Sequence, residues 1–393
     1  MDRRRFIALS SAAGALATLP WPTSRLRAQT APDKPLTQWK VNASEGFDAI
    51  AFTGALSGGE LYLQSYAKEA ADFGARLPKA ARDDLAALAK EADGDGFGLL
   101  WPNFATMLSG TDVSTIEAVL TALGEAERRI RPPLQASPYW DEKDWAWFAA
   151  RAPRLKAVFA AMRDSGFGAY RRQLLGSEMD LRAAEIAHGL ASYDVVRAQQ
   201  KFSGKALDPT IQIELLYFSK PHGVRVQGQR FLQAADYNLT TTLRIAAHEL
   251  LHPPFDMEGP VAKAALAVLA KDALVTRIVR DHDPRWGYTT LDGYLNEDVC
   301  QALDQMIAEV LGFARNPADR WNRADDGMHL LAAGLYALLR EDRWQDNGGS
   351  IEQWIGEAAR RGRLAPAVLH PAAARVLGRP VTQLWPLPAA PKA

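Results

Sequence analysis

The chemistry of this chain is concentrated in one short motif, His248-Glu249-Leu250-Leu251-His252. Side chains four residues apart lie on the same face of a helix, so the imidazoles of His248 and His252 can reach one ion. Imidazole nitrogens are common ligands of Zn²⁺, and the carboxylate of Glu249 is then held beside the coordination position that stays open for water. The motif therefore predicts a zinc hydrolase site on a helix over residues 239–251.

A catalytic zinc ion needs a third protein ligand, and the chain offers acidic candidates after the motif. Glu297 stands at the start of a predicted helix over residues 296–311. Glu258 and Asp256 follow the motif more closely. Asp256 also suits a turn after the two prolines, and Glu258 suits a capping or solvated position. The residue types alone leave these candidates open, together with a more distant ligand or no ion at all.

The combination of H-E-x-x-H with a downstream Asn-Glu, here Asn296-Glu297, resembles the gluzincin metallopeptidases, the group that contains the thermolysin-like enzymes. The resemblance covers residues 210–312. It implies that the two motif histidines bind zinc, that Glu249 is the general base and that Glu297 is the third ligand. Several uncharacterised exported bacterial families of this type are similar in outline, with a helical N-terminal half that begins near a strand-like segment, here residues 46–61.

Two features depart from the gluzincin pattern. Gln301 stands four residues after Glu297, where gluzincins often carry an Asp that orients the first histidine. A Gln can accept an N–H, but it does not raise the basicity of the ligand as a carboxylate does. The 45-residue gap from His252 to Glu297 is also long. Glu258 falls ten residues after the first histidine, where metzincins place their third ligand, although Phe255 replaces their turn-forming Gly.

A site of this kind predicts peptide hydrolysis. Zinc activates a water molecule, and Glu249 accepts its proton as the water attacks a polarised carbonyl. The oxyanion that results needs a further hydrogen-bond donor. Four residues are candidates for this donor: His222, His282, Tyr288 and Tyr294. Tyr294 is preferred because it lies close to Glu297 in the chain.

The N-terminus predicts export. Residues 1–30 resemble a twin-arginine-type signal peptide, because Arg3, Arg4 and Arg5 precede Phe6-Ile7 and a weakly apolar stretch. This predicts a periplasmic or secreted protein, cleaved near Ala28 or Ala31. Removing residues 1–28 takes away five Arg and one Asp from 46 basic and 46 acidic residues, and leaves 41 and 45. No later segment is long and apolar enough for a stable membrane span.

The remaining chain predicts an α-rich α+β fold. Residues 31–208 show helical spacing of apolar residues, interrupted by Gly and Pro clusters. Alternating patterns at 211–215 and 224–227 predict an antiparallel hairpin, part of a small antiparallel sheet. In this prediction residues 209–379 form a zincin-like metal-binding region, and residues 380–393 form a loose Pro-rich tail.

The segment 224–232 is also a candidate edge strand for pairing with a peptide substrate. Cys300 is the single cysteine, so no internal disulfide forms, and it is expected to pack as a small hydrophobe. His188, His329 and His370 are interpreted as structural or surface residues. The chain has no basic stripe, which argues against nucleic acid as a partner.

The sequence therefore predicts an exported zinc-dependent peptidase that acts on a peptide or protein substrate. The alternative is an exported non-catalytic binding protein with a vestigial or structural metal site. A third hypothesis is hydrolysis of esters or amides other than peptides. The oligomeric state, the cleavage preference and a propeptide stay open.

Overall fold

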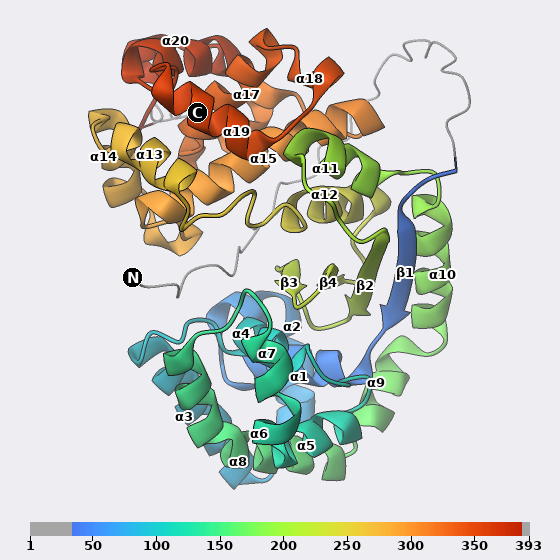
Figure 1. The fold of residues 1–393 in the computed structure, drawn as a ribbon. Helices are drawn as coiled ribbons and strands as arrows, with labels where there is room; N and C mark the ends of the chain where they lie inside the picture. Colours follow the sequence, from blue (N-terminus) through green and yellow to red (C-terminus); the bar gives the residue numbers. More distant parts are fainter. Residues whose placement is uncertain (1–33, 387–393) are drawn as a thin grey trace, which may run out of the picture.

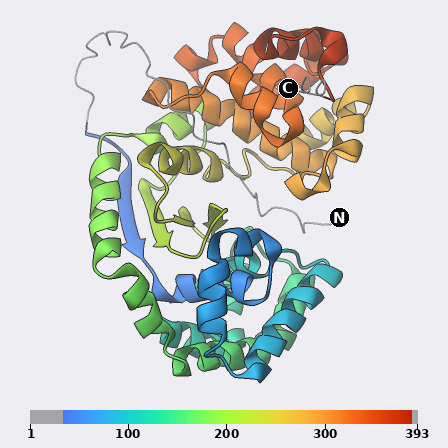
Figure 2. The ribbon, with the colours of Figure 1, turned by 180° about the vertical axis from the view of Figure 1, so that it is seen from behind.

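The computed structural model describes residues 34–386 of the chain. The predicted signal peptide and residues 387–393 lie outside the described residues. A small sheet lies between two groups of helices, as Figures 1 and 2 show. Its strands are β1 (Gln38–Ala43), β2 (Thr210–Leu216), β3 (Val224–Val226) and β4 (Arg230–Ala234), in the order β1-β2-β4-β3.

The sheet is mixed, not antiparallel as predicted. β1 pairs parallel with β2, and β2 pairs parallel with β4, while β3 pairs antiparallel with β4 at one edge. The predicted hairpin between 211–215 and 224–227 is therefore wrong. Two features explain the error. After β2 the amides of Tyr217 and Phe218 donate to the buried carboxylate of Asp48, which leads the chain away from the strand. Gly228, at a φ of +79°, then makes the tight turn that joins β3 to β4.

The N-terminal helices cover one face of the sheet, the face that carries Leu216, Val224 and Leu232. They are α1 (Glu45–Leu56), α2 (Glu60–Gly74), α3 (Lys79–Gly94), α4 (Leu100–Leu108), α5 (Ile116–Gly124), α6 (Ala126–Arg129), α7 (Arg131–Gln135), α8 (Glu142–Asp164) and α9 (Phe167–Leu175). The segment 46–61, which looked strand-like, is mostly helical. Residues 46–55 of α1 are all buried, so they lack the one-sided apolar spacing that indicates a helix.

The remaining helices form a second core on the opposite face, around Ile211, Ile213 and Phe231. They are α10 (Glu178–Leu190), α11 (Val195–Ser203), α12 (Leu239–Glu249), α13 (Pro260–Leu269), α14 (Ala273–Asp281), η1 (Pro284–Trp286), α15 (Leu291–Leu311), α16 (Pro317–Arg323), η2 (Asp325–Gly327), α17 (Leu330–Glu341), α18 (Trp344–Asn347), α19 (Ile351–Arg360), α20 (Pro366–Leu377) and η3 (Val381–Gln383). Packing thus divides the chain between α9 and α10.

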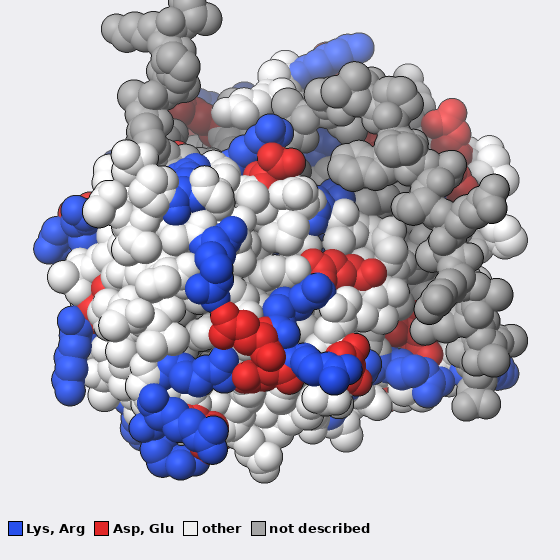
Figure 3. Space-filling view, turned by 90° about the horizontal axis from the view of Figure 1, so that it is seen from above, with Lys and Arg blue, Asp and Glu red and all other residues white. Residues whose placement is uncertain are grey.

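The predicted loose tail begins as packed chain. Leu384 and Trp385 are buried in the second core, and Arg277 donates to the carbonyl of Trp385 over 2.6 Å. The prediction of a loose tail relied on the prolines of this segment. Burial of these two apolar side chains stabilises its first residues against the second core. Within the described residues, no helix combines the length and the apolar composition needed to cross a bilayer. The face shown in Figure 3 carries basic and acidic side chains next to one another.

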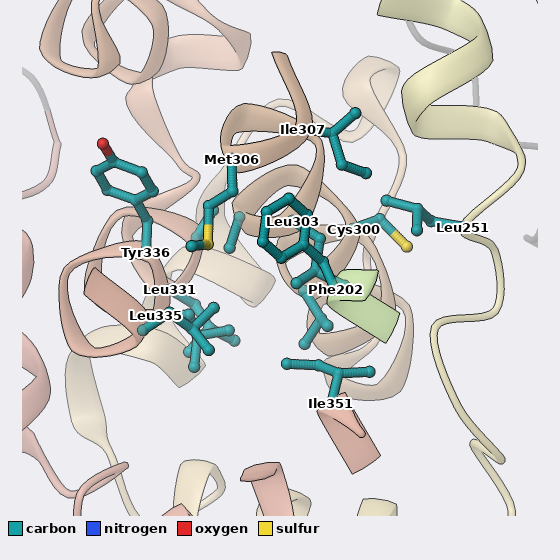
Figure 4. Close-up of a cluster of buried hydrophobic side chains, with 14 of the residues drawn as sticks. Phe202, Leu251, Cys300, Leu303, Met306, Ile307, Leu331, Leu335, Tyr336 and Ile351 are labelled. Carbon is teal, nitrogen blue, oxygen red and sulfur yellow. The ribbon is translucent and has the colours of Figure 1, made fainter. Parts of the chain in front are cut away.

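α15 is the central helix of the second core. Its residues 294–308 are all buried, and Thr290 caps it by accepting a hydrogen bond from the amide of Gly293. The helix therefore begins five residues before the predicted start. Figure 4 shows Cys300, Leu303 and other apolar side chains of α15 packed against side chains from neighbouring helices. The polar side chains of residues 294–308 are also buried. Several of them form the site described below, so the packing of α15 fixes their positions.

Truncating this core should destabilise the protein. Leu303 is completely buried, so Leu303→Ala should lower the free energy of unfolding by about 2–5 kcal/mol, because it removes apolar contacts and leaves a cavity. Urea denaturation followed by circular dichroism measures the loss. The matched control is Leu181→Ala, since Leu181 is 68% exposed, and it should change stability by at most about 0.5 kcal/mol. Equal losses in the two variants would contradict the placement of this core.

Candidate metal centre

The two motif histidines and Glu297 converge on one point, as predicted. Their ligand atoms all lie within 4.8 Å of one another. The Nε2 atoms of His248 and His252 face each other over 3.0 Å. The Glu297 carboxylate lies 3.5 Å from the first nitrogen through Oε1 and 3.4 Å from the second through Oε2. This group could hold a metal ion.

The local backbone places each of these side chains. Asn238 caps α12 by accepting a hydrogen bond from the amide of Thr241, and the helix runs to Glu249. His252 lies three residues beyond, in a tight turn in which its amide donates to the carbonyl of Glu249 over 3.4 Å. The residue before a proline is pushed out of the helical region, which accounts for this position just past the helix end. The packing of α12 against α15 then brings in Glu297.

The second nitrogen of each imidazole meets an oxygen. His248 Nδ1 lies 2.8 Å from Oδ2 of Asp304, and His252 Nδ1 lies 3.1 Å from Oδ1 of Asn296. Both oxygens are acceptors, so each ring donates from Nδ1, and Nε2 is the nitrogen that faces the centre of the group. Glu297 Oε2 is buried without a hydrogen-bond partner. Two imidazole nitrogens and one carboxylate oxygen, all directed inward, match the donor set of a divalent transition metal.

Asp304 takes the orienting role for which the sequence offered only Gln301. Asp304 follows Glu297 by seven residues, two helical turns along the same face of α15, and its carboxylate is also paired with Arg320. Gln301 instead donates to Glu297 Oε1 over 2.9 Å and accepts a hydrogen bond from the indole of Trp321. It therefore positions the carboxylate ligand and not a histidine. The seven-residue spacing on one helix was the available signal for Asp304.

The charges in this group stabilise one another. Burial alone would lower the pKa of His248, but the carboxylates of Glu297 and Asp304 raise that pKa well above its usual value. Burial alone would raise the pKa of Glu297, but the two histidines hold it well below its usual value. The raised pKa favours a protonated His248 in the metal-free protein, and its Nε2 lies 3.5 Å from Glu297 Oε1 and 3.0 Å from Nε2 of His252.

A cavity of about 120 Å³ opens on the metal group and is lined in part by His248, Glu297 and Tyr288. Burial, the negative charge of Glu297 and a hydrogen bond to Glu297 raise the pKa of the Tyr288 phenol well above its usual value. The charge of Glu249 raises this pKa further. Glu249 itself is 1% exposed. Tyr288 therefore lines the cavity beside Glu297 and keeps its proton as a hydrogen-bond donor.

Tyr294, the donor that the sequence favoured, does not line the cavity. It is completely buried, its hydroxyl donates to the carbonyl of Met328 over 2.7 Å, and it accepts from the amide of Leu331. These partners lie at the start of α17, so the hydroxyl of Tyr294 links α15 to α17 by hydrogen bonds. Tyr288, at a φ of +54°, is the tyrosine that faces the metal group. Such a left-handed conformation costs about 1–3 kcal/mol and is common at functional sites.

The other two donor candidates also lie outside the cavity lining. His222 is buried between the rings of Tyr62 and Trp101, and burial lowers its pKa to about 4. Both nitrogens of His282 face backbone carbonyls, those of Ile278 and Gly287. Neither imidazole is placed to meet a substrate at the metal group.

The rival acidic ligands are not part of the metal group. Glu258 and Asp256 are exposed, and the amide of Glu258 donates to the carboxylate of Asp256 in a local turn. Cys300 lies behind His252, with its sulfur 3.4 Å from Nδ1, the nitrogen that points away from the group centre. Burial and the charges of Glu297 and Asp304 raise the pKa of the thiol well above its usual value, so it stays protonated.

His329 has a closer link to the site than the sequence indicated. It is completely buried, between Asp298 at 2.6 Å and Asp325 at 2.9 Å, and its Nε2 lies 3.1 Å from Nε2 of Gln301. Burial lowers its pKa, but the two aspartates outweigh this effect and raise the pKa to about 10. His370 pairs with Asp272, and His188 is exposed on α10. No spacing in the sequence distinguished His329 from these two.

Comparison of the chain with protein-family models, with curated proteins and with solved structures gave no match.

Zinc binding to the metal-free protein should release protons. His248 is protonated at pH 7 because its pKa is raised, and it must lose this proton to act as a ligand. We expect about one proton per zinc ion at pH 7, falling towards none as the pH rises past the raised pKa. Calorimetric titration in buffers of different ionisation enthalpy measures this number. His188→Ala, at an exposed histidine, should release the same number, and zinc binding without proton release at pH 7 would contradict the assignment.

The Asp304→Asn variant should bind zinc about 10–100-fold more weakly, because the imidazole of His248 loses a carboxylate that orients it and raises its basicity. Competition against a chromophoric chelator measures the affinity. Asp319→Asn is the matched control, since Asp319 lies on α16 and its side chain is 67% exposed. An unchanged affinity in Asp304→Asn would show that this carboxylate does not support the ligand.

Proposed function

We propose that the protein is a zinc-dependent peptidase of gluzincin type, in which His248, His252 and Glu297 hold the ion and Glu249 is the general base. The observation that carries this proposal is the convergence of both motif histidines with a buried carboxylate from a second helix, within 4.8 Å. Two His and one carboxylate hold zinc in hydrolases and iron(II) in other enzymes, and the H-E-x-x-H motif, which sets Glu249 next to the first ligand, favours zinc.

The hydrogen bonds to the three ligand side chains are consistent with a catalytic metal site. A zinc ion in this group would polarise a substrate carbonyl and lower the pKa of a bound water molecule to roughly 7. Asp304 and Asn296 fix the two imidazoles, and Gln301 fixes the carboxylate ligand. Residues fixed in advance in this way add no reorganisation cost at the reaction step.

The proton steps fall to Glu249 and Tyr288. Glu249, next to His248 in the chain and almost completely buried, would accept a proton from the attacking water and pass it to the leaving amine. Tyr288 keeps its proton because its pKa is raised, so it can donate a hydrogen bond to the oxyanion. This assigns to Tyr288 the role for which the sequence favoured Tyr294.

The sheet edge beside the motif suits a peptide substrate. β3 is an edge strand, and Arg225 from its centre donates to the carbonyl of Glu249 over 3.0 Å. We propose that an extended peptide pairs with this edge, so that its backbone runs past the metal group. The proposal includes a zincin-like arrangement, in which the motif helix lies beside an edge strand.

The proposal also includes export of the protein by the twin-arginine-type signal at residues 1–30.

The Glu249→Gln variant tests the proposal. It should keep one zinc ion per chain and lose peptide hydrolysis by about 10²–10⁴-fold, because it removes the proton acceptor and leaves the ligands in place. Metal analysis and hydrolysis of casein and short peptides measure the two quantities. The matched control is Glu258→Gln, an exposed acid near the motif, which should retain both zinc and activity.

Other outcomes would replace the proposal. Equal background hydrolysis in wild type and Glu249→Gln, with zinc bound, would identify a non-catalytic binding protein. Glu249-dependent activity on esters or simple amides alone would identify a hydrolase of a different substrate class. Loss of zinc from Glu258→Gln, with zinc retained by a Glu297→Gln variant, would overturn the ligand set.

A further inference from the structure

The cavity beside the metal group extends along two facing helices. One wall is the face of α12 that carries Thr241, Arg244 and His248, which are three and four residues apart. The other wall is the face of α15 that begins at Glu297. The volume of about 120 Å³ is several times the ~10–15 Å³ that one water molecule needs. The metal group lies at one end of this space.

Three guanidinium groups line the same cavity, and we call them the arginine end: Arg244, Arg315 and Arg320. Arg320 is already paired with Asp304. Over residues 34–386, no carboxylate lies within ion-pair distance of Arg244 or Arg315. The guanidinium of Arg244 donates one long hydrogen bond, 3.4 Å, to the backbone carbonyl of Phe313.

These three cations repel one another. Burial and the positive charge of Arg320 lower the pKa of Arg244. Burial, followed by the charges of Arg244 and Arg320, lowers the pKa of Arg315 to about 10. The carboxylate that acts on both is that of Asp304, which already binds Arg320 and His248. The arginine end therefore carries positive charge that the acids among residues 34–386 do not neutralise.

The other acids of the cavity are also committed. Glu297 belongs to the metal group, and Asp325 lies 2.9 Å from Nε2 of His329. Clustered like charges repel one another unless a counter-charge joins them, most strongly where a guanidinium is shielded from water, as at Arg320, whose side chain is 16% exposed. Guanidinium groups bind carboxylates through two parallel hydrogen bonds, so a carboxylate is the ligand that best completes this cluster.

We propose that the arginine end binds a carboxylate of the substrate, close to the bond that is cleaved. Arg244 precedes His248 by four residues, about 6 Å along the helix axis. An extended peptide advances roughly 3.3 Å per residue, so the carboxylate lies about one or two residues from the scissile bond. It is either the C-terminal carboxylate or the side chain of an acidic residue. This inference names the substrate class of the proposed peptidase and rests on that function.

Binding of three N-acetylated tripeptides to the full chain, measured by calorimetry, tests the inference. The first has a free C-terminus and no acidic side chain, the second has an amidated C-terminus and a Glu, and the third is amidated without an acid. Chelator-treated protein is used for binding, so that the peptides are not cleaved, and zinc-loaded protein is used for hydrolysis. At least one acid-bearing peptide should bind about tenfold or more tightly than the neutral one. Tight binding of the first identifies the terminal carboxylate, and tight binding of the second identifies a side chain.

The variants Arg244→Gln and Arg315→Gln should remove this preference by about tenfold or more and leave the affinity for the neutral peptide unchanged. Arg315 is exposed at the rim of the cavity, so its substitution should not affect folding, and thermal denaturation checks both variants. Arg323→Gln is the matched control, because this side chain is 82% exposed on α16 and does not line the cavity.

The binding and hydrolysis arms fail independently. Equal binding of all three peptides, or a preference that survives in both arginine variants, would overturn the inference even if zinc-loaded protein hydrolyses peptides. A carboxylate preference that depends on Arg244 and Arg315, without hydrolysis by zinc-loaded protein, would support the arginine end and overturn the proposed peptidase function.

Discussion

The close approach of two imidazole nitrogens inside the protein is the constraint on which the rest of the site depends. The Nε2 atoms of His248 and His252 lie 3.0 Å apart with a buried carboxylate beside them. Two lone pairs at this distance repel unless a cation lies between or near them, so the arrangement needs either a proton or a metal ion. The packing of α12 against α15 maintains this approach, since one helix carries the first histidine and the other carries Glu297.

α15 contributes both to the apolar core and to the metal group. Its apolar residues fill the second core, as Figure 4 shows for Leu303 and its neighbours. Its polar residues Glu297, Gln301 and Asp304 form one row along the helix. Glu297 is the carboxylate of the metal group, Gln301 donates a hydrogen bond to it, and Asp304 orients the imidazole of His248. Because the core fixes the helix, it also fixes this row. The arginine end lines the same cavity as Glu297, and one of its members, Arg320, pairs with the Asp304 carboxylate that contacts His248.

The sequence predicted the local part of the site well and the long-range part poorly. The motif helix and the convergence of His252 and Glu297 with His248 were predicted, and the structure brings these residues together, although the helix ends at Glu249 and not at the predicted Leu251. The structure places Tyr288, and not Tyr294, in the lining of the cavity, because proximity in the chain to Glu297 says nothing of which neighbouring helix a buried phenol meets. The antiparallel hairpin was wrong because alternation identifies strands but not their partners.

By itself, the sequence determined the features that depend on spacing within a few residues. These are the two histidines four residues apart, the carboxylate between them, and the proline after His252 that keeps this residue outside the helix. Only the tertiary structure decided which distant groups meet them: Asp304 at the first histidine, Tyr288 beside Glu297, and three arginines along one cavity. The physical reason is that helical periodicity fixes which side chains share a face, whereas the packing of whole helices decides what that face meets.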